Sequence, residues 1–482
     1  MAFKENFPVD TRLPSVTIPR PETQRTLRGL RLVLLLLYFA FIVAVLALRY
    51  IVAPNIGAFR GDIERLLGEY SKREVVVGGI DMRWTGFSPR LVLEDVRVLD
   101  SEKRPALTIP RIEARVSWMS IPAAGPRLSL LDIGGMRLNL RRDAQGRFFF
   151  AGIPVDAEDS GNGLSDWLFA QRRIRLHGAT LTWEDEARRA PALELKEFNF
   201  ELDNGGKRHR FGLTARAPEN LASRIDLRGE LDAENWSAPT GRIYVDLDRA
   251  DLAALRPWVD YPIDLPRGRG AARIWAEVSK GRLEALTTDL AFHDISARLE
   301  KELPMLDLSR LSGRIRLRRP SSGFVLDTMG VELVTQAKIS EKAPKIEPWD
   351  FHIEWKPGKS GKMGSGRISA RQIDLGGLAA LSEYIPLDAD LRRRLRNEAP
   401  QGLLSNLEAR WDDGARRSYS LKTAFDGLGK KAVEELPGFS GISGTLDANE
   451  DGGAARIRSK GAAIELREVF PDAAIAFDTL DA

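Results

Sequence analysis

The side chains best suited to chemistry are few and scattered along the 482-residue chain. Cysteine is absent, which removes thiol nucleophiles, thiolate metal ligands and disulfides together. None of the histidines has the close spacing of a metal-binding motif such as His-Glu-x-x-His; they are His177, His209, His293 and His352. Each is expected to be an ordinary strand or turn residue, and the sequence predicts no catalytic group, no metal site and no cofactor.

One glycine-rich segment, from Gly358 to Gly366, is similar in composition to a phosphate-binding loop. A P-loop also requires a glycine five residues before its Gly-Lys-Ser/Thr end, and Ile353 occupies that position. The segment is better interpreted as a hairpin turn. No nucleophile, base and orienting group can be matched by spacing, so the chain is not expected to be an enzyme.

The charge balance excludes a further class of partner. The 72 Lys and Arg residues and the 68 Asp and Glu residues leave a formal net charge of +4. Nucleic-acid binding requires clustered basic residues. The longest such cluster, Arg392 to Arg394 with Arg396, fits one polar face of a helix. No nucleic-acid partner is expected.

A membrane anchor is predicted near the N-terminus, over residues 30–53. No charged or strongly polar residue occurs from Leu32 to Leu48, and a helix needs about 20 apolar residues to cross a bilayer. The alternative is a cleaved signal peptide, and Val45-Leu46-Ala47 could imitate its cleavage site. The apolar region of such a peptide is about 7–15 residues behind a short basic start, which favours the anchor here.

The residues around the anchor predict its orientation. Several arginines precede Leu32, and positive charge tends to remain in the cytoplasm. Residues 1–29 are then a disordered cytoplasmic tail, rich in proline. Residues 54–73 form an amphipathic helix with apolar positions on one face, which is expected to pack against the start of the sheet or on the membrane surface. Residues 74–482 lie outside the cytoplasm.

Beyond Glu74 the apolar period changes from helical to two. Ile112, Ala114, Val116 and Trp118, for example, alternate with polar residues, and such alternation indicates antiparallel strands with one apolar face. Helices interrupt the strands only over Asp251–Trp258 and Leu378–Arg396. The apolar face is expected to include Phe198, Phe200, Leu202, Phe211, Leu213, Ile243, Val245, Leu247, Phe351, Ile353 and Trp355.

The fold class is therefore mainly β, with an N-terminal transmembrane helix, an elongated antiparallel sheet and a few short helices. No linker or change of composition divides the strands into modules, which favours one long, coiled sheet. A series of β-sandwiches with closed cores would show the same alternation, and the pattern alone leaves this alternative open.

The order of several short segments resembles the YhdP branch of the AsmA-like envelope proteins. These segments are Trp84 to Leu91, Leu140 to Arg147 before Ala151-Gly152-Ile153, Asp251 to Leu255 before Arg267 to Gly270, Leu306-Asp307-Leu308 before Leu311 to Arg314, and Ile373-Asp374-Leu375. The resemblance implies a repeating β-groove, a sheet folded lengthwise into a trough. It also implies a single-pass protein of the bacterial inner membrane whose bulk lies in the periplasm.

The function implied by the resemblance is transport of phospholipid between the inner and outer membranes, in support of the outer-membrane barrier. The expected partners are phospholipid, the inner membrane, and outer-membrane or other envelope proteins. Contacts of the last kind would come through a C-terminal part that family chains have, so this sequence is expected to be an N-terminal part. A structural or assembly scaffold of the envelope is the competing function; an open groove favours transport, and a sealed core favours the scaffold.

Overall fold

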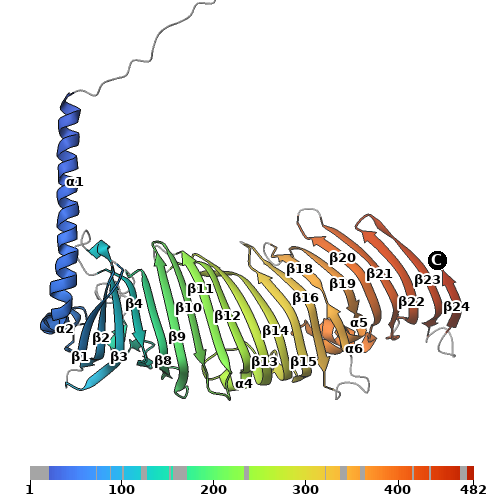
Figure 1. Ribbon diagram of the computed structural model, residues 1–482. Helices are drawn as coiled ribbons and strands as arrows, with labels where there is room; N and C mark the ends of the chain where they lie inside the picture. The colour runs from blue at the N-terminus through green and yellow to red at the C-terminus, as the bar shows by residue number, and fades with distance from the viewer. Residues whose placement is uncertain are drawn as a thin grey trace, which may run out of the picture.

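The computed structural model describes residues 21–482, apart from positions 72, 87, 100–102, 121–126, 151–152, 156–170, 233–237, 321, 337–344, 359–363, 415–416, 434–435 and 467–474. Most of the predicted tail and part of the glycine-rich turn lie outside the described residues. Figure 1 shows one long helix standing at the end of an elongated, twisted sheet.

The long helix, α1 (Pro21–Ala47), begins before residue 30, so residues 21–29 are helical rather than part of a tail. It continues through η1 (Leu48–Val52), η2 (Ala53–Phe59) and α2 (Arg60–Ser71). Among the described residues, only the helical stretch Gly29–Glu69 is long and apolar enough to cross a membrane. This finding supports single-pass anchoring.

All strands of the described residues belong to one sheet of 24 strands. They are β1 (Val75–Thr85), β2 (Ser88–Leu99), β3 (Pro105–Val116), β4 (Leu128–Gly134), β5 (Arg137–Arg142), β6 (Phe148–Phe150), β7 (Ile153–Val155), β8 (Arg173–Asp185), β9 (Leu193–Gly205), β10 (Arg208–Arg216), β11 (Arg224–Asp232), β12 (Thr240–Asp251), β13 (Asp264–Ser279), β14 (Arg282–Arg298), β15 (Leu306–Arg318), β16 (Phe324–Thr335), β17 (Lys345–Trp349), β18 (Phe351–Lys356), β19 (Ser365–Asp374), β20 (Gln401–Asp412), β21 (Ser418–Lys430), β22 (Gly438–Asn449), β23 (Gly452–Glu465) and β24 (Ile475–Asp481). The single sheet confirms the predicted architecture, and the alternative of separate β-sandwiches is wrong. The prediction was also wrong for Trp118, because β3 ends at Val116 and η3 (Trp118–Ser120) follows.

The sheet departs from antiparallel order at one junction. β4 and β5 both pair with β8 in parallel, with Leu131 opposite Ile174 and Arg137 opposite Thr180. The chain steps sideways between the two strands at Gly135, whose φ of 70° favours glycine and whose N–H donates to His177 O at 3.0 Å. β6 and β7 extend from β5 as a small side branch. The junction keeps the sheet in one layer.

β-bulges keep the apolar side chains on one face. Leu195 and Phe198 are both buried although three positions apart, a spacing that would place them on opposite faces of a regular strand. An irregularity between them, with Glu197 at a φ of 48°, restores the common face. Asp95, at a φ of 51°, does the same between Leu93 and Val96.

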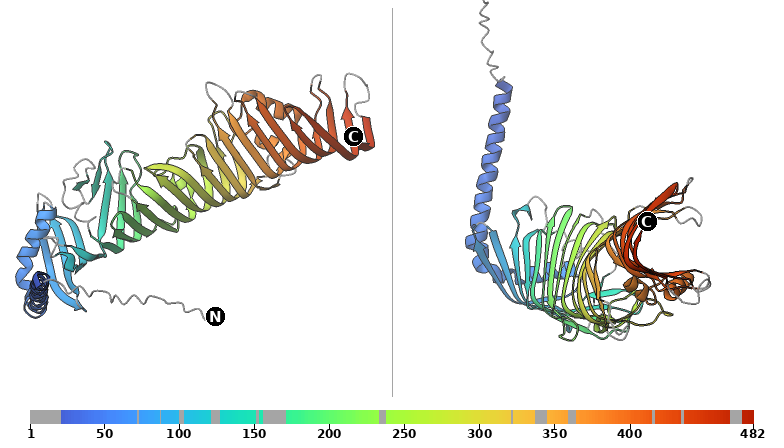
Figure 2. Two further views of the ribbon diagram at one scale, coloured as in Figure 1. Left: turned by 90° about the horizontal axis from the view of Figure 1, so that it is seen from above. Right: turned by 90° about the vertical axis from the view of Figure 1, so that its right-hand side faces the viewer.

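In the described residues, short helices connect the ends of strands: α4 (Leu252–Leu255) follows β12, and α5 (Leu375–Leu381) and α6 (Ala389–Glu398) follow β19. Leu255 of α4 packs against one buried cluster, and Leu381 of α5 belongs to a second cluster with Phe292 and Leu308. The end-on view in Figure 2 shows the sheet curled lengthwise, with the orange helices α5 and α6 at one lip of the curl. The apolar face is therefore the concave face, and both predicted helical interruptions are confirmed.

The predicted amphipathic helix covers the beginning of the concave face. Ile63 and Leu67 of α2 pack against the cluster that contains Val75 and Val77. The Glu64 carboxylate also accepts a hydrogen bond from Val77 N at 2.8 Å. α2 is therefore a packing helix, fixed to β1.

Asp251 connects α4 to the sheet and makes the fold sensitive to acid. Its carboxylate accepts from Ala254 N at 3.1 Å and pairs with Arg269 at 3.0 Å. Partial burial raises the pKa of Asp251, but these two contacts outweigh it and hold the pKa below its ordinary value of 3.8. The ionised carboxylate therefore stabilises the fold above that value, and this stabilisation is lost as the pH falls through the lowered pKa.

We expect Asp251→Ala to cost about 0.5–2 kcal/mol through loss of the helix cap. Hydrogen exchange of the α4 amides should show faster opening in the variant at neutral pH, and the difference should shrink in acid as the pH falls through the lowered pKa of Asp251. Asp251→Asn, which can still cap the helix but cannot pair with Arg269, should give an intermediate result. An unchanged difference in acid would contradict this account.

Candidate functional site: an apolar trough

The strand register aligns apolar residues into a continuous row along the concave face. Residues directly opposite each other on paired strands share a face. The row passes through Met82, Leu91, Ala114, Leu131, Ile174, Leu202, Phe211, Gly229, Ile243, Ala276, Leu286, Leu317, Leu326, Ile353, Ile368, Ala409, Leu421, Ala448 and Gly453. We call this set the apolar row. At about 4.8 Å per strand, it extends on the order of 85 Å along the sheet.

A second row lies beside the first over most of the same strands. It passes through Ile80, Leu93, Ile112, Ile133, Leu176, Phe200, Leu213, Leu227, Val245, Ile274, Thr288, Ile315 and Thr328. Only two threonines interrupt its aliphatic and aromatic side chains. The concave face is therefore apolar in width as well as in length.

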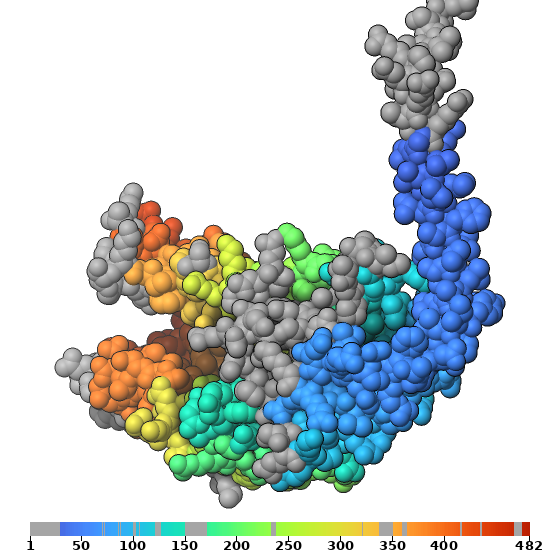
Figure 3. All heavy atoms as spheres, turned by 90° about the vertical axis from the view of Figure 1, so that its left-hand side faces the viewer, coloured from blue at the N-terminus to red at the C-terminus, as the bar shows by residue number. Residues whose placement is uncertain are grey.

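The trough formed by this face is open. Ile243, Leu317, Ile353 and Leu421 of the apolar row are all half-buried, whereas a closed core would bury them fully. Figure 3, seen from the α1 end, shows the two lips of the curled sheet standing apart with a hollow between them. Within the described residues, β1 pairs only with β2 and β24 only with β23, so the sheet does not close on itself.

Glycines opposite aromatic residues let the aromatic rings lie flat on the floor of the trough. The Phe211 ring lies over Gly229, where a Cβ would come within 2.2 Å of its Cζ atom. The Trp411 ring lies over Gly366 in the same way, with a contact of 2.2 Å to Cζ2. A larger residue at either position would lift the ring into the trough.

The opposite, outer face of the sheet is polar. Arg242 and Glu277, for example, are directly opposite each other, and each is a sequence neighbour of a residue in the apolar row. Asp289 pairs with Arg314, and the hydrogen bond from that guanidinium lowers the pKa of Asp289. Exposed pairs of this kind contribute only about 0–1 kcal/mol each. Their consequence is that the outer face remains in water.

The predicted lining residues all lie on the concave face, but not all are accessible from the trough. Phe198 and Leu202 are only 7% and 4% exposed, so they belong to the packed base. The others are half-buried; they are Phe200, Phe211, Leu213, Ile243, Val245, Leu247, Phe351, Ile353 and Trp355. Contact of these nine with a ligand stays a prediction.

Sequence reasoning missed several members of the apolar row. Leu286, Leu317, Leu326, Ile368 and Leu421 were not among the predicted lining residues. Period-two alternation was present around them, most clearly where arginines flank Ile315 and Leu317. Alternation marks a face, however, and only the register shows that these faces join.

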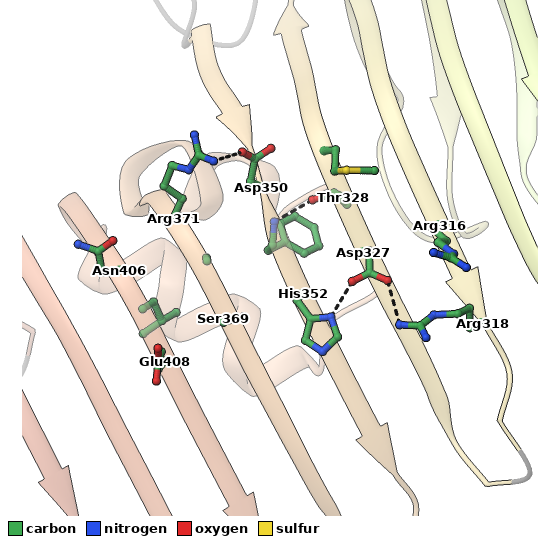
Figure 4. A pocket seen from close by; sticks show the side chains of 14 residues that line it. Arg316, Arg318, Asp327, Thr328, Asp350, His352, Ser369, Arg371, Asn406 and Glu408 are labelled. Atoms are coloured by element: carbon green, nitrogen blue, oxygen red, sulfur yellow. Dashed lines mark hydrogen bonds and ion pairs between the residues drawn. The ribbon is translucent and has the colours of Figure 1, made fainter.

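A polar hollow of about 600 Å³ on the outer face brings His352 between Asp327 and Ser369. His352 Nδ1 lies 2.6 Å from Asp327 Oδ1, and Figure 4 shows this contact beside the Arg371–Asp350 pair. Among the described residues, no hydrogen bond joins Ser369 to His352. The hollow therefore lacks the serine–histidine contact that nucleophilic catalysis requires.

The other histidines are dispersed along the sheet. His177 lies 2.7 Å from Asp132, and His209 lies 2.7 Å from Asn204 on the neighbouring strand. His293 is opposite Arg269 on one side and Arg310 on the other. In the part of the chain that the structure describes, no three His, Asp or Glu residues are placed to hold a metal ion.

A one-layer, open β-trough that begins at a helix long and apolar enough to cross a membrane defines this chain as a β-groove protein with a candidate membrane anchor. The family described as YhdP protein matches residues 22–482, and the chain belongs to that family. Comparisons with curated proteins and with solved structures gave no match. The resemblance inferred from the short segments is thus confirmed, and family membership supports a role associated with the cell envelope.

Proposed function

We propose that the chain conducts phospholipid along the trough, between the inner membrane and the outer membrane, and thereby supports the outer-membrane barrier. The observation that carries this proposal is the apolar row, which no polar side chain interrupts from Met82 on β1 to Gly453 on β23. In this proposal α1 crosses the inner membrane with its N-terminus in the cytoplasm, and the sheet lies in the periplasm.

The energetics of lipid transfer explain why such a row is useful. Each methylene that leaves an apolar environment costs about 0.8 kcal/mol, so exposing one ~16-carbon acyl chain to water costs on the order of 12 kcal/mol. A trough that shields the chains removes most of this cost. Its open side leaves the headgroup in water, so the headgroup need not be desolvated.

The proposed role is passive and requires no catalytic residue. The half-buried state of Ile353 and Leu317 favours transport over the alternative of a structural or assembly scaffold, because a scaffold has no use for an exposed apolar face. Large exposed apolar surfaces mark interaction sites, and an apolar surface that extends along the whole trough fits acyl chains.

Photocrosslinking from adjacent residues tests the proposal directly. A photoreactive amino acid at Leu317 or Ile353 faces the trough, whereas the same group at Arg316 or Glu354 faces the opposite side. In living cells we expect phospholipid adducts from the first pair and background labelling from the second, identified by mass spectrometry. Equal labelling at all four positions, or none at Leu317 and Ile353, would leave the scaffold as the better explanation.

A further inference from the structure

The C-terminal end of β3 and the N-terminal end of β4 lie beside α1, not beyond the C-terminal end of that helix. Both Figure 1 and the end-on view in Figure 2 show the lower part of α1 next to the first strands. η3 follows β3 at this point, and the Trp118 ring meets the Phe41 ring edge to face at a centroid distance of 5.0 Å. Phe41 lies inside the apolar part of α1, so η3 lies at membrane depth.

The exposure of α1 changes at the same level. Every residue from Leu30 to Ala40 is exposed. Ile42, Val45 and Leu48, which share one helix face at this spacing, are half-buried. The rest of the protein therefore covers one side of α1 from about Phe41 onwards, and the portion before Phe41 is bare.

The depth of this contact follows from helix geometry. Arg49 is the first charged residue after the apolar stretch, and Phe41 lies about 12 Å from it at ~1.5 Å per residue. One leaflet of the hydrocarbon core is roughly 15 Å thick. η3 thus reaches through most of the leaflet on the side of the sheet.

A set of arginines gives an independent measure of the same depth. Arg83, Arg90 and Arg115 are directly opposite one another on β1, β2 and β3. Trp118 follows Arg115 by three residues and lies just beyond the end of β3. The guanidinium of Arg49 lies 5.8 Å from the Trp84 ring centroid, beside this set. Arginine and tryptophan are typical of the membrane–water interface, so the arginines mark the headgroup level and Trp118 lies beneath it.

A path without charged side chains leads from this tip into the trough. No charged residue occurs from Val116 to Ser120, and Met119 is 62% exposed. Val116 and Leu128 pack with Ala114 and Leu131, which are members of the apolar row. The apolar row therefore begins next to an exposed apolar tip that lies against the membrane helix.

We propose that η3 and the adjoining ends of β3 and β4 are inserted into the bilayer leaflet on the side of the sheet. Phospholipid acyl chains then pass from that leaflet over Val116 and Leu128 to the apolar row, while the headgroups remain near the arginines. The insertion depends only on α1 crossing the membrane; the passage of acyl chains rests on the proposed function. The occupant of this surface is the acyl region of a phospholipid leaflet.

The absence of native cysteine allows each depth to be measured with a single spin label. Three single variants of the full chain are labelled separately: Met119→Cys, Tyr38→Cys within the apolar span, and Tyr419→Cys on the distant part of the sheet. Each is reconstituted into vesicles of phosphatidylethanolamine and phosphatidylglycerol. Electron paramagnetic resonance then compares collisions with dissolved oxygen and with a water-soluble nickel chelate. We expect the label at position 119 to be protected from the chelate as the label at position 38 is, and the label at 419 to be accessible to it.

Chelate access at position 119 equal to that at position 419 would overturn the insertion. The proposed function is measured separately, by lipid adducts from a photoreactive group at Leu317 in the same chain. Adducts at Leu317 together with a water-exposed position 119 would reject the insertion and leave conduction in place. A buried label at 119 without adducts at Leu317 would retain the insertion and reject conduction.

Discussion

We expect the double variant Leu326→Asp/Ile368→Asp, which places two carboxylates in the apolar row, to stop lipid from passing β18. The sheet should stay folded. Both positions are half-buried at the surface of an open trough, so the carboxylates can remain hydrated when the trough is empty. An acyl chain that passes must strip this water, and burying an unpaired charge is very costly. The variant should therefore block transport rather than folding.

The measurement uses photoreactive groups on either side of the block. Lipid adducts should persist at Leu286, between the membrane helix and the block, and should be lost at Leu421 beyond it. The matched control is Thr287→Asp/Ser369→Asp, which places two carboxylates on the outer face, next to Leu286 on β14 and next to Ile368 on β19. Adducts at Leu421 in both double variants would show that lipid does not follow the apolar row.

Truncation of Phe292 is expected to cause the largest loss of stability. Phe292 is only 6% exposed and packs in the cluster with Leu308 and Leu381, so Phe292→Ala removes a buried ring and leaves a cavity. Such changes cost about 3–5 kcal/mol. Ile353→Ala, in the open part of the trough, should cost only about 1–2 kcal/mol because its side chain is already half in contact with water.

Hydrogen exchange followed by mass spectrometry separates these effects by strand. In Phe292→Ala the amides of β13 to β15 should lose protection, and β21 to β23 should be unchanged, because each strand contacts mainly its neighbours. In Ile353→Ala the loss should be smaller and confined to β16, β18 and β19. Equal losses in the two variants would mean that the base and the open part of the trough do not differ in burial.

Alternation of apolar and polar residues was sufficient to predict the strands, because each strand has one apolar face. Phe351, Ile353 and Trp355 were placed correctly on β18 for this reason. The helix starts were less well predicted: α5 begins at Leu375, where Asp374 caps the helix by accepting from Gly376 N. The predicted start at Leu378 followed apolar spacing and overlooked this cap.

Other features were beyond the reach of local patterns. Period two carries no information about strand direction, so the parallel pairing of β4 and β5 with β8 could not be predicted. The contact between Phe41 and Trp118 joins segments far apart in sequence. The sequence could not predict whether the apolar face is open or covered, because the alternation of apolar and polar residues is the same in both cases.

The parallel pairing of β8 with β4 and β5 fixes the order in which strands can join the sheet during folding. A strand that follows a short turn can pair as soon as it emerges, since closing a short loop costs little entropy. β8 cannot join β4 and β5 until everything between Arg142 and Arg173 has emerged, because parallel strands need a long connection. A chain delivered from its N-terminus would assemble β1 to β5 first, pause with an unpaired edge, and then add the later strands one by one. Unpaired edges attract foreign strands, so the interval before β8 arrives is when a chaperone would be most useful.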